Sequence, residues 1–363
     1  MRASLKPFWL ALAAVWLTGV AAVPFYPWPA PPPPGVAAAF LLEASLFLTL
    51  GFPAVIERLK SPWWKSFQLG GRRRNRLRHA KNQTLGPPWG RPFGLPGLSP
   101  RAVKALSPVA LVVSGIAPYC LYGLATGVFE WRSLAVLAAL AALAACWFRV
   151  VPRHPLADFA FLAVVAAVSL TRLFPGLYAP AGPKFRVDFL GQMMWRRVAI
   201  LSVLLFRPMP GIDLGFLPAR REWLAGLREY LFFAPFGAAL SLSTGFARFQ
   251  PMKDEPLHAL LVVAGTFLGM FWFVALTEEF FFRGLLQQWL AGWFSNRWAG
   301  LLLASALFGA AHLTFRYPPL NWRFALVATV AGVFYGRAFQ RGGIRAAMVS
   351  HALVNVTWRV LFV

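Results

Sequence analysis

Long apolar runs alternate along the chain with short polar links. A helix needs about 20 predominantly apolar residues to cross a bilayer, and it satisfies all its backbone hydrogen bonds internally. The strict alternation of membrane barrel strands is missing. We therefore expect an all-α, polytopic transmembrane helical bundle of about 10–11 spans. The spans are predicted at residues 8–23, 36–56, 106–127, 133–150, 156–171, 189–206, 230–246, 257–290, 298–314, 324–339 and 344–362.

Composition and charge agree with a membrane protein. Hydrophobic residues make up 58% of the chain and charged residues only 13%, whereas a soluble domain carries about 25% charged residues. The net charge of +24 is concentrated, because twelve Lys/Arg and no acid lie between Arg58 and Lys104. Such a segment between apolar spans is typical of a cytoplasmic loop. We expect it to lie near anionic lipid headgroups, with no nucleic acid as partner.

The basic loop divides the chain. The first span resembles a signal peptide, but the next span follows after a short Pro-rich link, which favours an uncleaved anchor. Cys120 and Cys146 both lie in apolar spans and indicate neither a disulfide nor a metal site. The expected domains are an N-terminal transmembrane helix pair at 1–56, a Pro/Gly-rich cytoplasmic loop at 57–105, a helical bundle of unassigned role at 106–229 and a core at 230–363.

The stretch "ALTEEFFFRGLL" places two carboxylates and an arginine at membrane depth. Each such group costs about 2.5–3.5 kcal/mol on insertion, so it usually faces a partner or a cavity. Glu279 and Arg283 are spaced i, i+4 and can pair on one helix face. Glu278 projects about 100° away, by the helical period. We therefore predict a structural pair of Glu279 with Arg283, and a reactive carboxylate at Glu278 that suits a general base.

Two later motifs bring further polar groups towards Glu278. The turn near Asn296 lies 18 residues after Glu278 and 16 before His312, so antiparallel helices place these two side chains at similar depth. His351 and Asn355 are again spaced i, i+4, although counting leaves His351 about 10 Å from His312 in height. Glu278 with His312 can deprotonate a water. His351 and Asn355 can donate hydrogen bonds to the oxyanion that forms when water attacks an amide.

Each polar residue also has a structural interpretation. A lone intramembrane His or Asn usually bonds a neighbouring helix, and the glutamate pair by itself fits a structural salt bridge. Glu43, within the second span, is expected to pack or to bond another helix. No chemistry is assigned to the remaining histidines, which are His79, His154 and His258.

The ordered motifs resemble those of a known family. "EEFFFR" fits EExxxR, "FGAAH" (Phe308 to His312) fits FxxxH, and "HALVN" fits HxxxN. Over about residues 257–358 the chain resembles the CPBP family of CAAX proteases and bacteriocin-processing proteins, also called Abi, which includes the type II CAAX prenyl endopeptidases. The resemblance implies an intramembrane protease core at 230–363. Its implied catalytic residues are Glu278, His312, His351 and Asn355, supported by Glu279, Arg283 and Phe308.

The resemblance also bears on cofactors and partners. It implies a metal-free glutamate mechanism without cofactor; zinc is the lesser alternative, since HExxH is absent. The expected substrate is a membrane protein or a lipidated, CAAX-type peptide, and the expected location is a bacterial cytoplasmic membrane. Two other functions fit the same residues. One is an inactive scaffold or bacteriocin self-immunity protein, and the other is a proton-coupled transporter, although no internal repeat is evident.

Overall fold

The computed structural model describes residues 7–13, 33–60, 100–152, 154–171, 173–180, 186–207, 212, 214–315 and 320–363. Within these ranges the regular structure is helical, apart from an isolated antiparallel bridge between Phe249 and Phe362. The predicted all-α bundle is therefore confirmed. Part of the span expected at 8–23 and most of the basic loop at 57–105 lie outside the described residues.

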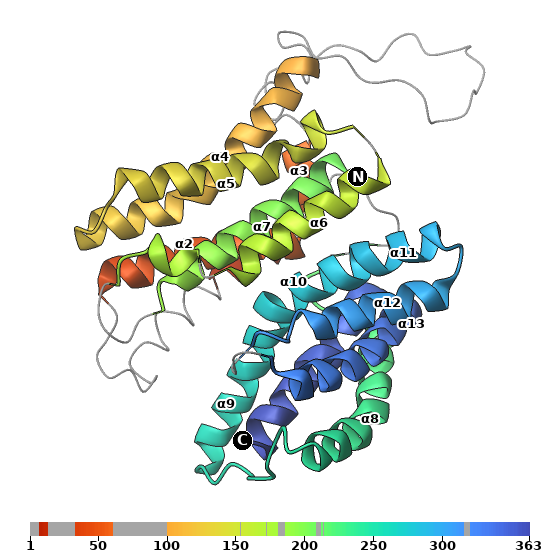
Figure 1. The fold of residues 1–363 in the computed structure, drawn as a ribbon. Helices are drawn as coiled ribbons and strands as arrows, with labels where there is room; N and C mark the ends of the chain where they lie inside the picture. Colours follow the sequence, from red (N-terminus) through yellow and green to blue (C-terminus); the bar gives the residue numbers. More distant parts are fainter. Residues whose placement is uncertain are drawn as a thin grey trace, which may run out of the picture.

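The first group of helices forms one bundle. Figure 1 shows α2, α4, α5, α6 and α7 side by side, coloured from red to yellow-green. Helix α5 buries Ala141, Ala144 and Ala145, small residues that let neighbouring backbones approach closely, as is usual in membrane bundles. The elements are α2 (Pro34–Leu48), η1 (Thr49–Gly51), α3 (Pro53–Lys60), α4 (Pro100–Thr126), α5 (Trp131–Val150), α6 (Pro155–Leu170), η4 (Phe174–Gly176) and α7 (Asp188–Phe206).

A buried ion pair fixes this N-terminal bundle. The Arg197 guanidinium on α7 donates to both carboxylate oxygens of Glu43 on α2, at 2.7 and 3.0 Å. It also donates to the Ser114 hydroxyl and carbonyl oxygens on α4. The interhelical role expected for Glu43 is confirmed. Because Arg197 is held by two helices, the rotation of α7 about its own axis is fixed.

The second group, in green to blue in Figure 1, forms a second bundle around α13. The two bundles share a continuous apolar core, in which Phe47 of α2 contacts Phe273 with ring centroids 5.4 Å apart. The elements are α8 (Arg220–Ser243), α9 (Pro256–Gly269), η5 (Met270–Ala275), α10 (Leu276–Glu279), η6 (Phe280–Gln287), α11 (Gln288–Trp293), α12 (Arg297–Ala310) and α13 (Trp322–Leu361).

Five helical segments in the described residues are long and apolar enough to cross a membrane, which supports an integral membrane protein. Helices α6 and α12 are shorter apolar helices. Helices α8 and α13 carry more charged residues, and these charges pair across the two helices. Glu229 of α8 contacts Arg337 of α13 at 3.0 Å and also Arg341. The five segments are Pro34–Gly51, Pro108–Thr126, Trp131–Val150, Asp188–Phe206 and Pro256–Trp293.

Helix α13 is bent at one residue. The spans expected at 324–339 and 344–362 form a single helix of 40 residues that bends at Gly343, where φ is 76°. Glycine is the residue that adopts this positive φ at little cost. The sequence thus predicted a break between the two spans near Gly343, although the chain continues there as a kinked helix. The kink directs the second half of α13, which carries His351, across the glutamate-bearing helix.

Candidate active site

The two glutamates lie in an irregular stretch of helix. Four residues of regular helix, α10, are flanked by the π-helical turns η5 and η6. A π turn bonds i to i+5 and so rotates the residues that follow it about the helix axis; such turns are frequent at functional sites. The sequence predicted one span at 257–290. The helix is continuous, but its π turns change which side chains share a face.

The predicted pair of Glu279 with Arg283 forms. Their carboxylate and guanidinium groups are 3.2 Å apart, and both side chains are fully buried. Arg283 also donates to the Gly332 carbonyl on α13 at 3.1 Å. Its guanidinium carbon lies 4.4 Å from the ring centroid of Phe308, within the range of a cation–π contact. Arg283 thereby joins the glutamate helix to α12 and α13.

His351 lies between the two glutamates. Its Nδ1 is 2.7 Å from Glu279 Oε1, and its Nε2 is 3.9 Å from Glu278 Oε2. A carboxylate only accepts, so Nδ1 carries a proton and donates it to this hydrogen bond. The ring stacks on Tyr335 at 4.6 Å, with an angle of 10° between the planes. The kink and crossing of α13 thus bring His351 to the depth of the carboxylates.

His312 is held by its own helix end. Its Nδ1 lies 2.7 Å from the Phe308 carbonyl oxygen, which only accepts, so Nδ1 donates and Nε2 keeps a free lone pair. Its ring lies between those of Phe308 and Phe324, with both centroids at 4.7 Å. In the described part of the chain, no direct hydrogen bond or ion pair joins His312 to Glu278.

Phe308 connects the two histidines. Its ring centroid is 4.7 Å from that of His312 on the same helix and 6.0 Å from that of His351 on α13. The same ring receives the Arg283 guanidinium. Phe308 is almost fully buried, so it holds these three groups in fixed positions without any polar contact of its own side chain.

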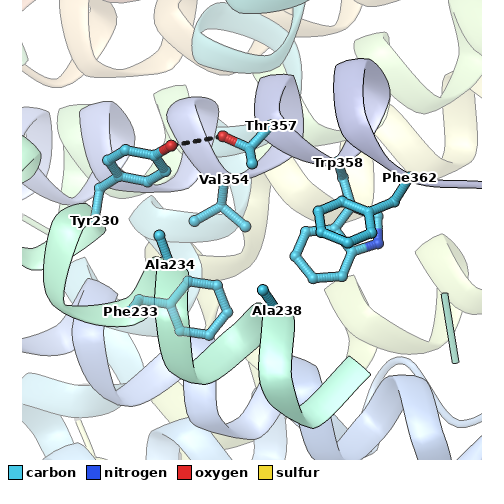
Figure 2. A pocket seen from close by; sticks show the side chains of 8 residues that line it. All are labelled: Tyr230, Phe233, Ala234, Ala238, Val354, Thr357, Trp358 and Phe362. Carbon is cyan, nitrogen blue, oxygen red and sulfur yellow. Dashed lines mark hydrogen bonds between the residues drawn. The ribbon is translucent and has the colours of Figure 1, made fainter. Parts of the chain in front are cut away.

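Asn355 lies one turn beyond His351. Its amide nitrogen donates to the His351 carbonyl oxygen at 3.1 Å, and its side chain is half-buried. Beside it, a small hollow lies between α8 and the end of α13, where the Tyr230 and Thr357 hydroxyls are 2.7 Å apart (Figure 2). Its free volume of about 20 Å³ holds roughly one water molecule rather than a peptide or lipid chain.

The two glutamates differ in their access to solvent. The Glu278 side chain is 25% exposed, whereas that of Glu279 is 0% exposed. Glu279 accepts from Arg283 and His351 through Oε1, and its Oε2 is buried without a protein partner. Glu278 is therefore the carboxylate that water can reach, and Glu279 is the one held by Arg283 and His351. Helical spacing predicted that Glu279 pairs with Arg283 and that Glu278 lies outside this pair, and the two environments agree with that prediction.

The sequence did not single out Tyr335 or Arg196. Tyr335 stacks on His351, but an aromatic residue within an apolar run is indistinguishable from ordinary core. Arg196 lies within the span predicted at 189–206, and the approach of its helix α7 to α10 depends on packing between distant parts of the chain. No three His, Cys, Asp or Glu side chains among the described residues gather closely enough to hold a metal ion.

This architecture and these side chains define a polytopic helical membrane protein with a polar site buried at the junction of three helices. Residues 260–357 match the family model described as type II CAAX prenyl endopeptidase Rce1-like. Over these residues the C-terminal part of the chain is therefore similar to the CAAX protease family, which supports the resemblance of the three motifs. Neither the curated proteins nor the solved structures gave a match. The family implies a membrane endopeptidase.

The glycine of the "FGAAH" motif permits close packing beside the site. A Cβ at Gly309 would lie 2.5 Å from the Ala325 carbonyl oxygen and would also collide with Thr329 on α13. We expect Gly309→Ala to displace α12 and His312, with a stability loss of about 1–3 kcal/mol, as for overpacking. Detergent titration followed by circular dichroism measures the loss. Gly292→Ala is the matched control, because no atom lies within 4 Å of a Cβ there; equal stability of the two variants would contradict this packing.

Proposed function

We propose that the C-terminal bundle is an intramembrane endopeptidase of glutamate type, in which Glu278 activates the attacking water. One observation supports this most strongly. Of the two adjacent glutamates, Glu279 is fully buried and hydrogen-bonded, whereas Glu278 is partly exposed beside the Nε2 of a fixed imidazole. A carboxylate that water can reach within an otherwise apolar helical bundle suits a general base.

His312 is the second group that acts on the water. Because its Nδ1 donates to the Phe308 carbonyl, its Nε2 is an acceptor fixed in direction by two flanking rings. Such a nitrogen can accept a hydrogen bond from the water that Glu278 deprotonates. The absence of a direct contact between the two side chains, within the described residues, is compatible with a water molecule between them.

His351 and Asn355 are proposed to stabilise the oxyanion. Because Nδ1 of His351 bonds to Glu279, Nε2 is the ring nitrogen left to face the substrate, and it donates to the oxyanion when it carries a proton. Asn355 supplies a second donor once its amide leaves the helix carbonyl for the substrate. Removal of a single donor of this kind typically costs about 10²–10³ in kcat. Glu279 acts by fixing the orientation of the imidazole ring.

The proposed substrate is a membrane protein or a lipidated, CAAX-type peptide whose scissile bond enters the bundle from the bilayer. We place the protein in a bacterial cytoplasmic membrane, with anionic headgroups near the basic loop. The proposed mechanism uses neither a metal nor another cofactor. The reaction is hydrolysis: water adds to the peptide carbonyl, its proton passes to Glu278, and the C–N bond breaks as the amine leaves with a proton.

The proposal is tested with the full chain reconstituted in vesicles that contain quenched-fluorescence peptides, prenylated and unprenylated. We expect cleavage that survives strong chelators and that falls about 10²–10⁴-fold in His312→Asn, as for loss of acid–base assistance. Loss of cleavage on chelation, restored by zinc, would favour the metalloprotease. A folded protein that cleaves no membrane peptide would favour the scaffold or immunity function.

A further inference from the structure

Tyr335 lies against the imidazole ring of His351, although both residues belong to α13. Tyr335 precedes the kink at Gly343 by eight residues, and His351 follows it by eight. In a straight helix two residues at this spacing would be about 24 Å apart, at 1.5 Å per residue. Their ring centroids are only 4.6 Å apart. The kink at Gly343 therefore turns the second half of α13 back towards the first and creates this contact.

The hydrogen bond to Glu279 leaves one motion of the imidazole ring free. Nδ1 of His351 lies 2.7 Å from Glu279 Oε1, which fixes the position of that nitrogen. Rotation of the ring about this single bond would still move Nε2, which lies 3.9 Å from Glu278 Oε2. Nε2 is the nitrogen that the proposed function assigns to the oxyanion. A second contact that fixes the plane of the ring is therefore needed to place it.

The Tyr335 ring supplies this second contact. Its plane is inclined by only 10° to that of the His351 imidazole, and stacked rings at such a distance are a favoured arrangement. The Phe308 ring is farther from the same imidazole, at 6.0 Å, and nearly perpendicular to it, at 86°. Tyr335 is itself only 2% exposed, so the surrounding core holds it in place. The ring that lies flat against His351 is thus a fixed one.

The same tyrosine ring also contacts the other donor to Glu279. Arg283 Nη1 donates to Glu279 Oε1 at 3.2 Å, and its guanidinium carbon lies 5.4 Å from the ring centroid of Tyr335. A guanidinium over the face of an aromatic ring is attracted to it. Both groups that donate to Oε1, the Arg283 guanidinium and the His351 imidazole, therefore rest against one aromatic ring.

We propose that Tyr335 is a positioning residue for the proposed hydrolysis. By lying flat against His351 it fixes the plane of the imidazole ring, and it thereby directs Nε2 towards the substrate carbonyl. The inference rests on the proposed function for its catalytic meaning, whereas the stacked geometry can be measured without any substrate. Because the proposal uses the ring and not the hydroxyl group, phenylalanine should replace tyrosine here, and an aliphatic residue should not.

The test compares Tyr335→Leu with Tyr335→Phe in the full chain, reconstituted in vesicles with quenched peptides. Leucine removes the ring, and a misplaced group can lower a rate about 10²-fold. We expect kcat to fall about 10–100-fold in Tyr335→Leu with KM nearly unchanged, because the oxyanion forms only in the reaction. Tyr335→Phe should recover most of this loss. Should Tyr335→Leu fail to fold, Tyr335→Met takes its place.

A spectroscopic signal reports the stacked contact itself. Histidine labelled with ¹³C is incorporated, and the ring protons of His351 are assigned by their absence in His351→Asn. A stacked aromatic ring shields these protons. We therefore expect their NMR signals to move downfield in Tyr335→Leu and to stay nearly in place in Tyr335→Phe. Equal positions in the unaltered protein and in Tyr335→Leu would reject the contact.

Phe334→Leu is the matched control, because it removes a neighbouring ring from the same half of α13. The Phe334 ring contacts Phe233 of α8, with centroids 5.8 Å apart, so we expect kcat and the His351 signals to stay unchanged. An equal fall of kcat in both leucine variants overturns the inference, as does an unaltered kcat in Tyr335→Leu. A raised KM at unchanged kcat in Tyr335→Leu makes Tyr335 a substrate-binding residue and likewise rejects positioning. A shift of the His351 signals in a chain that cleaves nothing supports the contact and rejects the proposed function.

Discussion

Replacement of Glu278 by glutamine is expected to lower peptide cleavage about 10²–10⁴-fold, the usual contribution of a general base. Glutamine keeps the size of the side chain and can still accept a hydrogen bond, but it cannot take a proton from water. Because Glu278 is partly exposed and lies 3.9 Å from His351 Nε2, too far for a strong hydrogen bond, the variant should fold normally. Single-turnover cleavage of a quenched peptide, alongside circular dichroism, measures both quantities.

The control for this prediction lies on the same helical run. Glu255 is an exposed residue at the start of α9, and Glu255→Gln makes the same chemical change outside the site. We expect its cleavage rate to be unchanged. Full activity of Glu278→Gln would remove Glu278 from the mechanism, and an equal loss in both variants would indicate a general effect of the lost charge.

Arg283→Met is expected to destabilise the protein by about 3–5 kcal/mol, because it leaves the Glu279 carboxylate buried without its cation. Arg283 is fully buried, donates to Glu279 and Gly332, and lies against Phe308. Methionine fills much of its volume, so the loss comes chiefly from the uncompensated charge. Unfolding by dodecyl sulfate in mixed micelles, followed by circular dichroism, gives the change in free energy.

A double variant separates the charge from the packing. If the loss of stability arises from the unpaired Glu279 carboxylate, the double variant Glu279→Gln with Arg283→Met should be more stable than Arg283→Met alone. A double variant that loses the sum of the two single losses would show that the pair is not coupled. A loss below about 1 kcal/mol in Arg283→Met would contradict a buried ion pair, since that is the range of exposed pairs.

Much of the fold followed from the length and spacing of apolar runs. The bundle, the i, i+4 pair of Glu279 with Arg283 and the break in the last helix at Gly343 were predicted from local sequence. These features depend on neighbours within a few residues.

Features that depend on distant packing were not predictable in the same way. The π turns around α10 follow from no evident sequence pattern, and they help bring both glutamates to one imidazole ring. The stacking of Tyr335 on His351 joins the two halves of the kinked α13, and the packing of α7 against α10 joins helices far apart in sequence. Spacing alone also left a height difference at His351, whereas in the structure its Nδ1 lies 2.7 Å from Glu279 Oε1.

The central claim is that Glu278 and His312 act on one water molecule, and the non-additivity of their loss tests it most directly. Single-turnover cleavage is measured for Glu278→Gln, His312→Asn and the double variant in the same vesicles. Groups that serve one step as a unit give non-additive losses, so the double variant should be about as slow as the slower single variant. Losses that multiply would show that the two side chains act independently, and would contradict the shared water.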